Sequence, residues 1–162
     1  MKRTLRQIRI DQRIALKQVE KLGIKICCDP CERELAMCLF LPLLQIFGEE
    51  MSDLSLIYLY WQDEQPEELQ GIDGWCNTFI HPATGRQICA IGLSLDALHC
   101  SLDYAVMVSI HELAHLKYAG DDCRFFPYMD KLLERYNRAT DSDIQNDYVE
   151  GGECHGDKKK LL

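Results

Sequence analysis

The residues of this sequence best suited to chemistry are His111, Glu112 and His115, which form the pattern His-Glu-x-x-His. On an α-helix, side chains four positions apart lie on one face, one turn above the other. Two imidazoles on that spacing can bind one zinc ion, and Glu112 then lies beside the metal-bound water as a general base. A chance match in a chain of this length has odds of roughly one in a hundred. The pattern therefore predicts a zinc site, provided that the segment is helical.

A catalytic zinc site needs a third protein ligand. Asp121 lies six residues after His115, the offset at which the HExxHxxGxxH pattern places its third ligand, although the Gly of that pattern is absent. Asp122 is an adjacent competitor, and Glu134 fits an arrangement in which the following helix supplies a glutamate. His155 is a further alternative. We expect Asp121 to be the ligand, while a Gly-Asp-Asp turn that is merely solvated stays open.

The motif must be positioned by a helix that we predict from Ser101 to Tyr118. The segment contains no Gly or Pro, Ser101 is a suitable N-cap, and Asp103 lies in the first turn. Gly120 supplies a stop signal. Apolar residues surround this helix on most sides, which indicates a buried position. The structural alternative is a buried helix whose two histidines only make hydrogen bonds in the core.

The other expected elements follow from hydrophobic periodicity and turn residues. Pro42 should kink or break the second helix, and the linker His81–Gly85 is typical of a hairpin loop. We predict helices over Leu5–Leu22, Cys31–Phe47 and Phe125–Arg138, strands over Leu54–Trp61, Trp75–Ile80 and Arg86–Leu95, and a loop over Gln62–Gly74.

These elements predict an α+β fold in which a small antiparallel sheet packs on the motif helix, with additional N-terminal helices. The chain divides into an N-terminal helical segment at 1–50, a zincin-like core at 51–140 and a polar tail at 141–162. At 162 residues it is long enough for one domain with a proper core.

Composition restricts the partners. A formal charge of -8 argues against a nucleic-acid binder that relies on bulk electrostatics, and the basic residues near the N-terminus are expected to form a solvated helix face. No stretch is long and apolar enough to span a bilayer, and no signal peptide is visible. Nine cysteines without such a signal indicate reduced thiols and a cytoplasmic protein. Cys28 and Cys31 form a CxxC pair that could share a metal with Cys154 and His155, but ordinary thiols are the favoured reading.

The chain resembles the YgjP/WLM and SprT-like zinc metallopeptidases over roughly residues 55 to 138. The motif helix is the specific part of this resemblance, and the flanking segments are looser. Where those families carry a third His, this chain has Asp121. The matching segments are Asp103–Leu116, Gly120–Phe126, Trp75–Asn77, Gly85–Ile88 and Leu93–Leu95.

The resemblance implies a compact α+β peptidase core in which the strand before the motif helix, Arg86–Leu95, pairs with an extended peptide substrate. We therefore expect a zinc-dependent peptidase with Glu112 as general base and a peptide or protein substrate. The alternative is a catalytically degenerate zincin-like protein with a binding or regulatory role. Candidates for stabilising the oxyanion are Tyr118, Arg124, Tyr128 and Tyr148.

Overall fold

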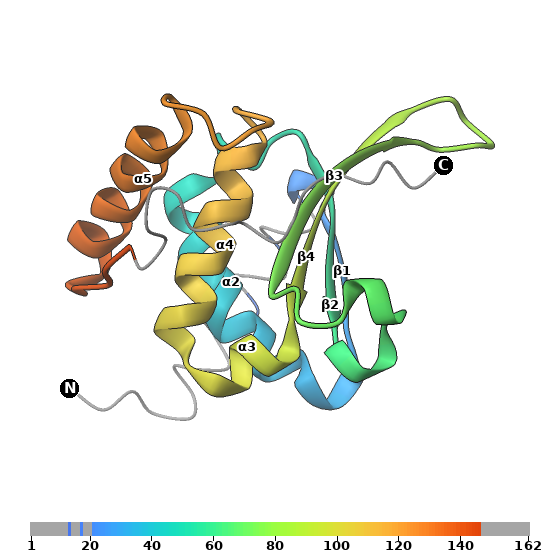
Figure 1. Ribbon diagram of the computed structural model, residues 1–162, viewed down its shortest axis with the longest axis horizontal. Helices are drawn as coiled ribbons and strands as arrows, with labels where there is room; N and C mark the ends of the chain where they lie inside the picture. The colour runs from blue at the N-terminus through green and yellow to red at the C-terminus, as the bar shows by residue number, and fades with distance from the viewer. Residues whose placement is uncertain (1–12, 14–16, 18–20, 147–162) are drawn as a thin grey trace.

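The structure, a computed structural model, describes Arg13, Lys17 and residues 21–146 of the chain. A four-stranded sheet carries helices α2, α4 and α5 on one side (Figure 1), so the predicted α+β class is confirmed. The elements are β1 (Lys25–Cys27), η1 (Pro30–Glu32), α2 (Arg33–Phe47), β2 (Leu54–Tyr60), η2 (Gln62–Glu64), η3 (Glu67–Leu69), β3 (Gly74–Ile80), β4 (Gln87–Ser94), α3 (Leu95–Cys100), α4 (Leu102–His115) and α5 (Phe125–Thr140), where η marks a short 3-10 helix.

The sheet is mixed, so the predicted antiparallel pairing is wrong for most of it. Its strand order is β1-β2-β4-β3, and only β3 and β4 pair antiparallel. β1 pairs parallel with β2, and β2 pairs parallel with β4. The physical reason is that β4 is inserted between β2 and β3, which makes β3 an edge strand.

The loop after β2 makes this insertion possible because it carries the chain across the end of β4. The amide of Ser94 donates to the carbonyl of Asp73 at 2.8 Å, and the amide of Gln62 donates to Oδ2 of Asp96 at 2.9 Å. β3 then returns beside β4 through the predicted hairpin, whose His81 amide donates to the carbonyl of Arg86 at 2.8 Å.

Helix α4 runs through the middle of the domain, as its apolar sequence predicts. Every residue from Ala105 to Ala114 is buried. Ser101 is the N-cap, and its hydroxyl accepts from the amide of Tyr104 at 3.4 Å. The helix ends at His115, well before Gly120, so the second histidine of the motif occupies the last turn.

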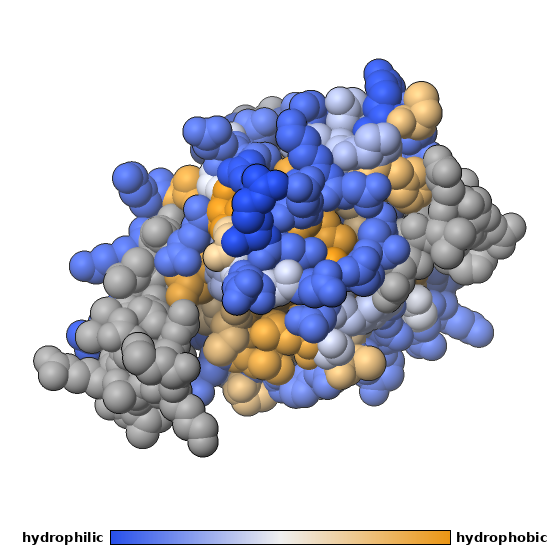
Figure 2. Space-filling model, turned by 90° about the vertical axis from the view of Figure 1, so that its left-hand side faces the viewer, coloured by the Kyte–Doolittle hydropathy of each residue, from blue (hydrophilic) through white to orange (hydrophobic). Residues whose placement is uncertain are grey.

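Helices α2 and α5 complete the core against α4. α2 continues through Pro42 without a break, and the carbonyl of Cys38 that loses its partner there belongs to an exposed residue. α5 is amphipathic: Met129, Leu132 and Leu133 are buried, and its polar residues give the mostly hydrophilic face seen in Figure 2.

Residues 141–146 pack back on the end of α5. Asn137 donates to the carbonyl of Ile144 at 2.8 Å and accepts from its amide at 3.0 Å, and Ile144 is buried. Most of the predicted helix Leu5–Leu22, and the polar tail from residue 147, lie outside the described residues. Within the described ranges, no helix combines the length and the apolar character needed to cross a bilayer.

Candidate metal centre

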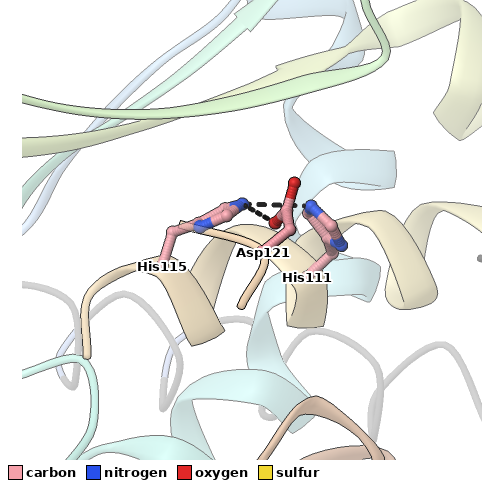
Figure 3. Close-up of side chains that lie close together, drawn as sticks. All are labelled: His111, His115 and Asp121. Carbon is pink, nitrogen blue, oxygen red and sulfur yellow. Dashed lines mark hydrogen bonds and ion pairs between the residues drawn. The ribbon is translucent and has the colours of Figure 1, made fainter. Parts of the chain in front are cut away.

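His111, His115 and Asp121 converge at the C-terminal end of α4 (Figure 3). The Nε2 atoms of the two histidines are 3.1 Å apart, and Oδ1 of Asp121 lies 3.4 Å from Nε2 of His115. One ligand atom from each residue lies within 4.8 Å of the others. The structure therefore brings together the three residues that the sequence favoured as metal ligands.

Two of the spacings between these atoms are close to those of a tetrahedral zinc site. With zinc–nitrogen and zinc–oxygen bonds of about 2.0–2.1 Å, two ligand atoms of a tetrahedral site are roughly 3.3 Å apart. The distances of 3.1 and 3.4 Å are both close to that value. Two imidazoles and a carboxylate are also a common donor set for catalytic zinc.

His115 is oriented by the backbone that follows the helix. Its Nδ1 lies 3.1 Å from the carbonyl oxygen of Tyr118, which can only accept a hydrogen bond. Nδ1 therefore carries a proton, and Nε2 lies towards His111 and Asp121, where a metal would bind. The turn is held in place because the amide of Tyr118 donates to the carbonyl of Ala114 at 3.0 Å.

Phe125, the first residue of α5, supports both imidazole rings. Its side chain is fully buried, and its ring centroid lies 4.8 Å from that of His111 and 4.4 Å from that of His115. Burial and the neighbouring His115 lower the pKa of His111 to about 4. His111 is therefore neutral at pH 7, which is the form that binds a metal.

The competing third ligands are engaged elsewhere. Oδ2 of Asp122 pairs with Nη2 of Arg124 at 2.6 Å, and these hydrogen bonds lower the pKa of Asp122 to about 2. Glu134 is exposed on α5 and pairs with Arg138 at 2.6 Å. Asp121 alone among these three carboxylates joins the histidines. His155, the remaining alternative, lies outside the described residues.

Glu112 is almost fully buried on α4, next to the two candidate histidine ligands. Burial, reinforced by the negative charge of Asp121, raises its pKa to about 8. The carboxyl group is therefore largely protonated at pH 7 in the metal-free protein. A divalent cation nearby favours the carboxylate instead, because it compensates the negative charge.

Gly74 brings the start of β3 against this carboxyl group. A Cβ atom built on Gly74 would lie 2.6 Å from Cγ1 of Val108 and 2.9 Å from Oε1 of Glu112. The absent side chain is thus what lets the edge strand approach Glu112. The preceding Asp73 anchors the strand, since it accepts from the hydroxyl of Tyr104 and from Nε2 of Gln62. Sequence patterns gave no sign of either role.

The edge strand that lies next to Glu112 is β3, which corrects the expectation that Arg86–Leu95 pairs with a peptide. β4 occupies that range and is already paired on both sides. Cys76, on β3, faces the motif helix, and burial together with Glu112 raises the pKa of its thiol to about 12. It therefore stays protonated at pH 7.

Three of the four oxyanion candidates, Tyr118, Arg124 and Tyr128, form one group that follows the metal-binding end of α4. The rings of Tyr118 and Tyr128 are 5.4 Å apart, Nζ of Lys117 lies 4.5 Å from the Tyr128 centroid, and Arg124 lies over Tyr118 at 5.4 Å. Tyr148 lies outside the described residues.

The CxxC pair lies apart from this centre. Cys28 follows β1, Cys31 lies in η1, and both are free thiols. Burial raises the pKa of Cys28, so its thiol is not activated. Their suggested partners, Cys154 and His155, lie outside the described residues.

Comparison of the chain with protein families, with curated proteins and with solved structures gave no match. The assignment of this site therefore depends on its own geometry. The imidazoles of His111 and His115, the carboxylate of Asp121 and the buried Glu112 lie together where α4 meets the edge of the sheet.

Proposed function

We propose that this protein is a zinc-dependent peptidase. His111, His115 and Asp121 hold the metal, and Glu112 is the general base. The observation that carries the proposal is the convergence of one ligand atom from each of the three residues within 4.8 Å, with two of the distances, 3.1 and 3.4 Å, close to those of a tetrahedral zinc site. The resemblance of the motif helix to SprT-like and YgjP/WLM peptidases agrees with it.

Zinc in this position would supply a Lewis acid that polarises a carbonyl and lowers the pKa of a water molecule. The protein's own contribution is proton transfer by Glu112. Its carboxylate takes a proton from the attacking water and delivers it to the nitrogen of the leaving amine. The carboxyl group is almost fully buried and lies close to the backbone of Gly74, which limits its movement before the transfer.

The edge strand β3 is the element that can hold an extended peptide. Its far side has no pairing partner within the described residues. Backbone groups on such an edge bind a peptide by strand addition, with little dependence on its sequence. Because Gly74 contacts Glu112, a peptide on β3 would lie beside the general base.

The test has three parts, made on the full chain. Elemental analysis should find one zinc per chain, a peptide library should be cleaved, and a chelator should abolish cleavage. Glu112→Gln should keep the zinc and lose turnover, whereas the control Glu134→Gln, in an exposed pair with Arg138, should keep both. A folded protein that binds no zinc and cleaves nothing would favour the alternative, a degenerate zincin-like binding protein.

A further inference from the structure

A pocket lies beyond the carboxyl ends of the three parallel strands β1, β2 and β4. The elements that line it differ from those that carry the metal centre. Its volume is about 280 Å³. Cys27 ends β1, Tyr60 ends β2, and Leu95 directly follows β4, and all three line the pocket. In open α/β sheets, the crevice at the carboxyl ends of parallel strands is the usual ligand position.

Three of the residues that line the pocket, Tyr58, Tyr60 and Trp61, are aromatic, and their rings are held in place by contacts of their own. The rings of Tyr58 and Tyr60 stack at 5.9 Å with an angle of 18° between their planes. Tyr60 is fixed because its hydroxyl donates to the carbonyl of Ile72 at 2.8 Å. Trp61 stacks on His99 at 5.2 Å. The rings are thus positioned before any ligand arrives, which reduces the entropy lost on binding.

The side chain of His99 is itself held by Glu32, the last residue of η1. Nε2 of His99 lies 2.6 Å from Oε2 of Glu32. The His99 ring on which Trp61 stacks is therefore held by η1, not by the loop that carries Trp61. Through His99, the Trp61 side chain on the pocket wall is thus linked to η1.

Two carboxylates lie on the same wall, from Asp29 and Glu64. Neither takes part in an ion pair within the part of the chain that the structure describes. No Lys, Arg or His is among the lining residues. Electron-rich ring faces beside unpaired carboxylates attract a cation and disfavour an anion.

We propose that this pocket binds the basic side chain of a peptide or protein partner, an alkylguanidinium or alkylammonium group. Tyr58, whose side chain is exposed, supplies a ring face for the cation, and Asp29 and Glu64 supply the opposite charge. The pocket is of a size for one side chain rather than for a cofactor. The net charge of -8 speeds the approach of a basic partner. This inference does not depend on zinc or on peptidase activity.

The probe is N-acetyl-arginine methylamide, and N-acetyl-citrulline methylamide is its neutral counterpart. Each is titrated into the full-length, isotope-labelled protein with a chelator present, and amide NMR shifts are followed. The arginine compound should shift amides at Asp29, Glu64 and along Tyr58–Trp61, and the citrulline compound should not. Equal shifts with both compounds, or shifts that map elsewhere, would overturn the proposal.

Two pairs of variants separate the pocket from bulk charge. Glu64→Gln should raise Kd about threefold to fivefold, while Asp63→Asn, in the same η2 turn but outside the pocket, should leave it unchanged. Tyr58→Leu should weaken binding by about twofold to fivefold, and Tyr58→Phe should retain it. Equal losses for Glu64→Gln and Asp63→Asn would mean that only the overall charge matters, and the proposed pocket would be wrong.

Discussion

Replacing Glu112 by Gln in the metal-free protein should change how the free energy of unfolding depends on pH. The ordinary pKa of this carboxyl group is 4.5, and in the folded protein burial raises it to about 8. The folded state therefore binds the proton more tightly than the unfolded state. Its contribution to stability is most favourable below pH 4.5 and is lost progressively as the pH rises towards 8. Gln does not titrate, so the free energy of unfolding of the variant should not fall in this way as the pH rises.

The size of the effect follows from the pKa difference. A tenfold change in proton affinity is worth about 1.4 kcal/mol. Between pH 6 and 8, the unfolded carboxyl group is ionised while the folded one is still largely protonated. The wild-type protein should therefore lose about 2 kcal/mol relative to Glu112→Gln over this interval. His111, whose pKa is lowered to about 4, is present in both proteins, so its effect cancels to first order.

Urea unfolding followed by circular dichroism, with a chelator present, measures the difference at pH 6, 7 and 8. Glu134→Gln is the matched control, because Glu134 is exposed and pairs only with Arg138 among the described residues. Its curve should run parallel to that of the wild type. If the Glu112→Gln curve also runs parallel, Glu112 is not held as a buried acid and the reasoning fails.

Three further predictions concern the metal ligands and their supports. Asp121→Asn should weaken zinc binding at least tenfold in a chelator competition, while Glu134→Gln should not; equal affinities would remove Asp121 from the ligand set. Gly74→Ala should destabilise the protein by about 1–3 kcal/mol in urea unfolding, because the methyl group would overlap Val108 and Glu112; an unchanged midpoint would contradict that close contact. Phe125→Ala should cost about 3–5 kcal/mol and also weaken zinc binding, and zinc affinity unaffected by the change would show that Phe125 does not hold the imidazoles.

Local signals in the sequence were sufficient for most helices and strands. Ser101 marked the start of α4, the hairpin at His81–Gly85 was correctly placed, and α5 began at Phe125 as expected. These features depend on residues close in sequence, such as an N-cap or a turn. The same is true of His111 and His115, whose proximity follows from helix geometry alone.

Features that depend on distant residues could not be predicted in this way. β1 has only three residues and shows no alternation, and its parallel partner β2 lies about thirty positions further on. For the same reason, the sequence did not show that β4 lies between β2 and β3, so that β3 and not β4 is at the edge. The contact of Gly74 with Glu112 joins a strand to a helix, and no pattern in the sequence records it.

The central place of β4 has a consequence for synthesis on the ribosome. β2 leaves the exit tunnel before its neighbour β4 has been synthesised. Until then, one edge of β2 is unpaired, and Ile57 and Leu59 lack the core contacts that β4 and α4 later provide. The β3–β4 hairpin forms from local contacts and then docks between β2 and solvent as a unit. A nascent chain released before Gln87 lacks the strand that joins β2 to β3, and it presents an open β-edge that favours aggregation.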